Sequence, residues 1–149
     1  MCSFRESVLF FSDISSSICF VNIVPFTRAT ESWSFCSEQQ YWLDDYVLFR
    51  EIRHLNQARA WFDWPQELRE RHPDALNKVR QERDEALMIR RFEQYVFFTQ
   101  WQQLREYANK KGVKLFGDMP IFVAHDSADV WAEPLLFTLD EQGASTRVA

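Results

Sequence analysis

The sequence lacks three features, each of which would indicate a particular class of protein. Its three cysteines, Cys2, Cys19 and Cys36, form no Cys-x-x-Cys pair, so neither a disulfide framework nor a structural zinc site is supported. It has no run of about 20 apolar residues that could cross a membrane. Its formal charge is −5, so it also lacks the basic surface with which proteins hold nucleic-acid phosphates.

These absences set the first expectations about the environment and partners of the chain. An odd number of unpaired cysteines is typical of reduced thiols, so we expect a cytoplasmic protein. We expect no metal, no cofactor, no nucleic-acid partner and no membrane association. The length of 149 residues suits one domain, and 46% hydrophobic residues suffice for a core. The aromatic share of 16% is high and indicates either a heavily packed interior or surfaces that stack on sugars.

The first thirty residues differ from the rest of the chain. They hold four charged residues, against thirty-five in the remainder, together with six serines and two apolar runs at 8–11 and 18–24. Three interpretations are open: a weak secretory signal, a β-hairpin around residues 12–17, or a segment foreign to the fold that follows. We favour the third, because Asp13 and a serine cluster interrupt any signal-peptide core.

Residues 37–55 are predicted to form a helix. Ser37 can cap it, and apolar residues from Trp42 onward recur with helical spacing. Asp44 and Asp45 suggest paired catalytic carboxylates, but adjacent helical residues point about 100° apart. We therefore expect one exposed acid and one acid paired with a nearby arginine.

An aromatic turn, Trp61-Phe62-Asp63-Trp64-Pro65, follows. Its two tryptophans could stack on glucose rings, but packing between helices is the favoured interpretation. Residues 74–111 are helical again by pattern. A single helix of that length would measure roughly 57 Å, too long for a compact domain, so we expect a break near residues 89–91. The part from Phe92 to Leu104 is apolar around most of its circumference, which predicts burial on several sides.

Gly112 is predicted to end this helix, and the apolar residues 113–116 then predict a short strand of a parallel sheet. Asp118 follows that strand, at the edge where α/β folds assemble their sites. Asp126 and Ser127 are predicted to cap a helix over residues 128–131. His125 is expected to be an exposed loop residue, since no serine or cysteine nucleophile is paired with it by spacing.

Five segments, in this order, resemble elements of the amylomaltases, which are 4-α-glucanotransferases of the α-amylase-like superfamily. They are YWLDDYVLF (41–49), AWFDWP (60–65), the FxQYxFFxQWxxLxxYANxKG pattern (92–112), GDMPIFVAHDSADVWAEP (117–134) and LFTLDEQG (136–143). The resemblance covers about residues 31–149. A first barrel strand and a tyrosine-bearing sugar-binding loop, which the family carries before this region, are not found here.

The resemblance implies an α/β fold: the N-terminal part of a TIM (β/α)8 barrel with a large helical insertion, incomplete in this chain. It divides the chain into an atypical segment (1–30) and a partial catalytic domain (31–149). That domain would consist of a helical subdomain at 37–111, a barrel strand with a conserved loop at 113–134, and a hairpin at 135–149.

The resemblance also implies a function, the transfer of α-1,4-glucan segments between maltooligosaccharides by a retaining double displacement. Asp118 matches a family aspartate that supports substrate, and Asp126, Ser127 and Trp131 are further candidates for substrate binding. The nucleophile and the acid/base lie on later barrel strands of the family, which would come after Ala149, so no catalytic residue is assigned in this chain. The alternative is a truncated, non-catalytic product with at most weak glucan binding.

Overall fold

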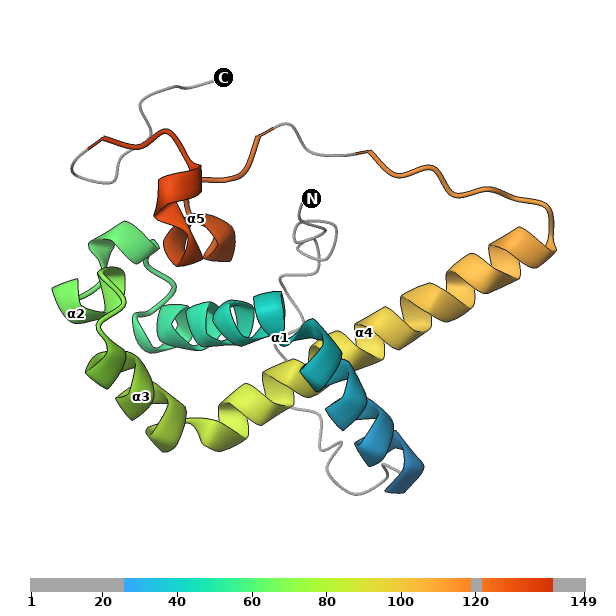
Figure 1. Cartoon of the computed structure of the whole chain (residues 1–149), viewed down its shortest axis with the longest axis horizontal. Coiled ribbons are helices and arrows are strands. Elements are labelled where there is room, and N and C mark those ends of the chain that lie inside the picture. The colour runs from blue at the N-terminus through green and yellow to red at the C-terminus, as the bar shows by residue number, and fades with distance from the viewer. Residues whose placement is uncertain (1–25, 119–121, 141–149) are drawn as a thin grey trace.

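The computed structural model describes residues 26–118 and 122–140, which form a helical body with a long extended connection (Figure 1). Helix α1 (Phe26–Leu55) packs against helix α4 (Asp84–Lys110), and the chain passes between them through η2 (Trp61–Asp63), α2 (Gln66–Arg69) and α3 (Pro73–Glu82). After α4 the chain returns to α1 and forms α5 (Ala128–Ala132) and η3 (Pro134–Leu136). In the described part of the chain, no helix is long and apolar enough to span a bilayer.

One hydrophobic core joins α1, α3, the N-terminal half of α4, and α5. Phe35 of α1 contacts Tyr95 and Phe98 of α4, with ring centroids 5.9 and 5.2 Å apart, so aromatic side chains fill the crossing of the two long helices. The buried members of the core are Phe35, Trp42, Leu43, Val47, Leu48, Phe49, Ile52, Trp61, Trp64, Leu76, Val79, Leu87, Tyr95, Ala128, Val130 and Trp131.

Helix α1 begins at Phe26, well before the predicted start at Ser37. The prediction that Ser37 caps the helix is wrong, because Ser37 lies in an exposed position inside it. The helix extends further because its N-terminal turns carry Phe35, which packs on α4 and gives those turns a buried side chain. Residues 26–30 of the atypical segment are thus helical, whereas residues 1–25, on which the three interpretations of that segment rest, lie outside the described residues.

The helical stretch after Pro73 is broken as predicted, but at Arg83 and not near residues 89–91. Arg83 adopts φ −122° and ψ 23°, which ends α3, and α4 begins at the next residue. The Arg83 side chain binds Glu51 of α1 at 2.8 Å, as described below. The break therefore lies at Arg83, the residue whose side chain pairs with the buried Glu51.

Helix α4 is buried over its first half only. Tyr95 is buried and Phe92, Val96 and Phe98 pack against the core, but Trp101, Leu104 and Tyr107 are 42%, 54% and 62% exposed. The expectation of burial on several sides fails for this second half, which extends away from α1 after the two helices cross in Figure 1. Gly112, with φ 76°, ends the helix as predicted, and its left-handed conformation suits glycine.

Residues 113–118 are extended and exposed but form no strand, so the predicted barrel strand over 113–116 is wrong for this structure. The physical reason is that a parallel strand needs neighbours to bond its backbone, and this segment runs alone along the outside of the molecule (Figure 1). Of the expected hairpin at 135–149, residues 134–136 form η3, and residues 141–149 lie outside the described part of the chain.

Candidate functional site

The four predicted substrate-binding residues divide into two groups in the structure. Asp118 lies at the exposed end of the extended segment, directly after Phe116 and Gly117, and Phe116 is fully exposed. Asp126, Ser127 and Trp131 lie together at the start of α5, packed against the helical body. The sequence placed all four in one motif, but only the second group is held by the described residues.

Asp126 joins α1 and η2 to the loop before α5. Its Oδ1 accepts a hydrogen bond from the Trp61 backbone N–H at 3.2 Å, and its Oδ2 pairs with Arg53 Nη1 at 2.9 Å. The prediction that Asp126 caps the following helix is therefore wrong, because both its oxygens face residues more than sixty positions earlier. An acid directly before a helix has the sequence pattern of an N-cap. The residues around Asp126 do not indicate that it would instead bind Arg53 and Trp61, which come much earlier in the sequence.

Ser127 is the helix cap, as predicted. Its backbone is extended, at φ −134° and ψ 160°, and its hydroxyl accepts a hydrogen bond from the Val130 N–H. The serine is 5% exposed, so the cap also satisfies a buried polar side chain. Its observed contacts are those of a structural residue at the start of a five-residue helix.

Trp131 is 1% exposed and packs in an aromatic cluster with Phe49 and Trp64, at centroid distances of 5.9 and 5.7 Å. Its indole N–H donates to the Leu68 carbonyl at 3.0 Å, and the Arg71 guanidinium lies 4.2 Å from its ring centroid. Both the polar edge and the ring of Trp131 are thus engaged by protein groups. The described contacts make it an anchor of α5 on α2.

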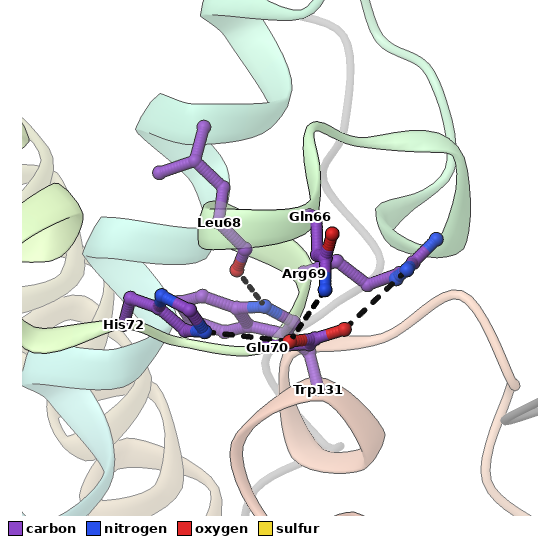
Figure 2. A network of polar contacts seen from close by, with 6 residues as sticks. All are labelled: Gln66, Leu68, Arg69, Glu70, His72 and Trp131. Carbon is purple, nitrogen blue, oxygen red and sulfur yellow. Dashed lines mark hydrogen bonds and ion pairs between the residues drawn. The ribbon is translucent and has the colours of Figure 1, made fainter.

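Figure 2 shows Trp131 beside a network of polar side chains around Glu70. Glu70 accepts a hydrogen bond from Gln66 at 3.2 Å and contacts Arg69 at 3.5 Å and His72 at 3.3 Å. The Gln66 hydrogen bond, with smaller effects of His72 and Arg69, lowers the pKa of the Glu70 carboxyl. The network is exposed to solvent, so it orders the α2 turn rather than forming an enclosed site.

The adjacent acids Asp44 and Asp45 pair with different arginines. Asp45 lies 2.6 Å from Arg71 Nη2, and Asp44 lies 3.0 Å from Arg91 Nη2. We expected one acid to be exposed and the other to be paired with an arginine. Both acids are paired, and Asp44 is also exposed to solvent. Their partners belong to different parts of the molecule, the turn after α2 and α4, so the two acids do not form a shared catalytic pair. Arg71 has φ 59°, an uncommon conformation for a residue with a side chain, and it places the guanidinium between Asp45 and Trp131.

Glu51 is a buried acid that the sequence reasoning missed. It is 1% exposed, and Arg83 and Arg90 each approach one of its oxygens to 2.8 Å. Burial raises the pKa of Glu51, but the hydrogen bonds and charges of Arg90 and Arg83 outweigh it and hold the pKa below its ordinary value. A signal was present in the sequence, since Glu51 falls four residues after Val47 on the apolar face of α1.

The tryptophans and His125 form the remaining part of the site. Trp61 and Trp64 are 5% and 3% exposed, so the favoured interpretation of core packing is confirmed. His125 is half-buried, and its ring stacks on Phe62 with centroids 4.9 Å apart. The expectation of an exposed His125 is therefore wrong, because an aromatic neighbour from η2 covers one face.

The described residues offer little for nucleophilic or metal chemistry. Burial raises the pKa of the half-buried Cys36 thiol, which disfavours the reactive thiolate. Within residues 26–118 and 122–140, no group of three or more His, Cys, Asp or Glu side chains is arranged to hold a metal ion. Among the predicted substrate-binding residues, Asp118 is an exposed carboxylate and Asp126 is held by the helical body.

The nucleophile and the acid/base belong to a part of the family that the resemblance places after Ala149. Ala149 itself lies outside the described residues, which end at Asp140. The structure therefore does not test where those two carboxyl groups would stand, and their place after Ala149 stays a prediction.

Comparison with known proteins gives the family. A family model described as 4-alpha-glucanotransferase matches residues 20–146. The chain is 40% identical over 116 residues to a 4-alpha-glucanotransferase of Synechocystis and 41% identical over 116 residues to one of Thermus thermophilus. These matches cover 77% and 78% of this chain but 23% of each relative, so the chain spans about a quarter of their length.

A solved structure agrees. The chain is similar to an amylomaltase from Streptococcus agalactiae in complex with acarbose, with a TM-score of 0.74 and 34% identity, over 80% of this chain and 24% of that one. The match shows that about four fifths of this chain has the fold of the corresponding part of that protein. Since the family model covers most of the chain, this protein belongs to the 4-alpha-glucanotransferase family.

Proposed function

We propose that this chain is the substrate-supporting segment of a 4-α-glucanotransferase, which transfers α-1,4-glucan segments between maltooligosaccharides. The observation that carries the proposal is the motif at 117–134, which lies within the match to the family and ends in an anchored helix. The similar amylomaltase from Streptococcus agalactiae holds acarbose, a saccharide analogue, which supports a glucan as the ligand class.

The chemistry of the whole enzyme would be a retaining double displacement. One carboxylate attacks the anomeric carbon, and a carboxylic acid about 5 Å away protonates the leaving oxygen. In the second step the same group, now a base, takes the proton of an acceptor sugar's hydroxyl, which attacks the anomeric carbon and releases the enzyme carboxylate. By the family resemblance, both groups belong to parts of the enzyme that follow the residue equivalent to Ala149. Asp118 would contribute a charge and hydrogen-bond acceptor near the bond that is cleaved, not the nucleophile.

The division into parts is also a proposal. Residues 37–111 would be a helical subdomain, residues 113–134 a barrel strand with its loop, and residues 135–149 a hairpin. In a complete (β/α)8 barrel, residues 113–116 would find the parallel neighbours that they lack here. The exposure of Val113, Leu115 and Phe116 supports this, because such side chains favour burial.

The test is an activity measurement in a hybrid enzyme. Residues 31–146 of this chain would replace the matching segment of the Thermus thermophilus 4-alpha-glucanotransferase, and glucose release from maltotriose would be measured. We expect Asp118→Asn to lower kcat of the hybrid by about a hundredfold or more, the loss typical of removing one preorganised polar group from a transition state.

Asp74→Asn is the matched control, since Asp74 is an exposed acid in the first turn of α3 and the substitution is the same. It should leave kcat within about twofold of the unsubstituted hybrid, the range of an ordinary surface change. Equal kcat for Asp118→Asn and Asp74→Asn would end the assignment of Asp118 to the substrate site.

A further inference from the structure

Trp61 contacts two consecutive residues of the loop before α5 through two different N–H groups. Its indole Nε1–H donates to the His125 carbonyl at 2.7 Å, and its backbone N–H donates to Asp126 Oδ1 at 3.2 Å. The first distance is at the short end of the range for N–H···O bonds. Two hydrogen-bond donors on one buried residue fix both the position and the direction of a peptide segment. With a single hydrogen bond the segment could still rotate.

Other contacts reinforce the same two loop residues. The His125 ring packs edge-on against Trp61, at a centroid distance of 5.4 Å, and stacks on Phe62. Arg53 of α1 pairs with the second oxygen of Asp126 at 2.9 Å. The end of α1 and the nearby η2 thus contact a loop more than sixty positions later in the sequence, and Trp61, which is 5% exposed, makes two of these contacts.

The rest of the loop is fixed from the same side. Ser127 caps α5, and Trp131 binds the Leu68 carbonyl (Figure 2), so residues 125–131 are tied to the helical body at both ends. Asp118 is eight residues before Asp126 and belongs to the extended, exposed segment. The helical body therefore holds the part of the motif at 117–134 that begins at His125.

We propose that Trp61 is a positioning residue of the glucan-binding site: its two N–H groups hold His125 and Asp126 and thereby fix residues 125–127 within the motif at 117–134. This inference rests on the proposed function. It assigns to the aromatic turn a role in substrate affinity, although Trp61 is buried and does not itself stack on a sugar.

The first arm of the test needs no activity. Hydrogen–deuterium exchange would be measured on the 149-residue chain for Trp61→Phe, which keeps an aromatic ring and the backbone N–H but removes the indole donor. We expect the amides of residues 125–131 to exchange several-fold to about tenfold faster, as loss of one hydrogen bond to a buried donor predicts.

Trp42→Phe is the matched control. Trp42 is also buried, and its indole donates to Gln39 Oε1 at 2.9 Å, within α1 and away from the loop. It should leave exchange at residues 125–131 at the wild-type rate. If both variants accelerate exchange equally along the chain, Trp61 acts only as a core residue and the inference is overturned.

The second arm measures kcat and KM for maltotriose in the hybrid enzyme. Trp61→Phe should raise KM about fivefold or more with kcat within about twofold of the unsubstituted hybrid, and Trp42→Phe should leave both unchanged. Unchanged KM, or a fall in kcat alone, for Trp61→Phe overturns the inference. Should Trp61→Phe fail to fold, Asp126→Ala removes the acceptor from the loop side and must raise KM in the same way.

An inactive hybrid would count against the proposed function and not against the contact, which the exchange arm decides by itself. Conversely, an active hybrid with no exchange difference between Trp61→Phe and Trp42→Phe would leave the proposed function standing and remove Trp61 from the site.

Discussion

Glu51 shows how a single side chain can join three helices. It lies on the buried face of α1 and receives Arg83 from the α3–α4 junction and Arg90 from α4, each at 2.8 Å. A buried carboxylate is tolerated only when it is paired and hydrogen-bonded, and both of its oxygens are satisfied here. Because Arg83 lies at the junction where α3 ends and α4 begins, the contacts of Glu51 also connect this junction to α1.

We expect Glu51→Gln to destabilise the helical body by about 3 kcal/mol, the lower end of the range for breaking a buried ion pair, because Arg83 is partly exposed. The measurement is urea unfolding followed by far-ultraviolet circular dichroism. Glu85→Gln, an exposed acid in the first turn of α4, is the control and should change the free energy of unfolding by less than about 0.5 kcal/mol. Equal effects would show that the Glu51 cluster contributes no special stability.

The same residue gives a pH dependence. The pKa of Glu51 is lowered in the folded chain, so its contribution to stability is present above its unfolded pKa, near 4.5, and is lost as the pH falls through the lowered folded value. The melting temperature of the unsubstituted chain should therefore fall on acidification below about pH 4.5, and the fall should be smaller in Glu51→Gln. Identical pH profiles for the two proteins would contradict the assignment.

At the scale of elements, the two halves of α4 have different surroundings. The first half packs on α1, whereas the second half continues with Trp101, Leu104 and Tyr107 exposed into the extended residues 113–116. Adjacent exposed apolar side chains of this number favour association between molecules. The element is folded as a helix, but much of its apolar surface has no partner among the described residues.

We therefore expect the 149-residue chain to self-associate at micromolar concentration. The double substitution Trp101→Gln with Leu104→Gln should shift the population toward monomer in sedimentation velocity. Met88→Gln, at an exposed residue in the first half of α4, is the control and should leave the association unchanged. A monodisperse monomer with one cooperative thermal transition, for the unsubstituted chain at all concentrations, would contradict this expectation.

The elements also show what the sequence could predict. Local signals were sufficient for the end of α4 at Gly112 and for the cap at Ser127, since each depends on the backbone of its immediate neighbours. The start of α1 and the break at Arg83 were misplaced because they depend on packing against α4 and on a pair with Glu51, thirty-two residues earlier.

For the candidate site, too, the sequence could predict local features but not contacts between distant residues. Motif and order were enough to find the family and to select the segment from Asp118 to Trp131. They could not show that Asp126 binds Arg53 and Trp61, because those contacts join residues brought together only by folding. The predicted strand at 113–116 failed for a related reason: local apolar character favours a strand, but the neighbours that would complete it are not part of the described structure.

At the scale of the whole molecule, the described residues form a helical body with an extended segment that carries Asp118. Its relatives are more than three times as long, and the family chemistry needs two carboxyl groups placed about 5 Å apart across a sugar. Among the described residues, the candidates assigned to the site are the exposed Asp118 and the anchored residues Asp126, Ser127 and Trp131. The proposed role is support of substrate within a 4-alpha-glucanotransferase, and we expect no transfer by the 149-residue chain alone, because no nucleophile or acid/base is assigned among the described residues.

The most direct test of that claim compares two proteins in one assay. Glucose release from maltotriose would be measured for the 149-residue chain and for the hybrid enzyme that carries residues 31–146, both purified from a host without amylomaltase activity. The account predicts release by the hybrid and none above the no-protein control by the chain alone. Release by the chain alone, or an inactive but folded hybrid, would contradict it.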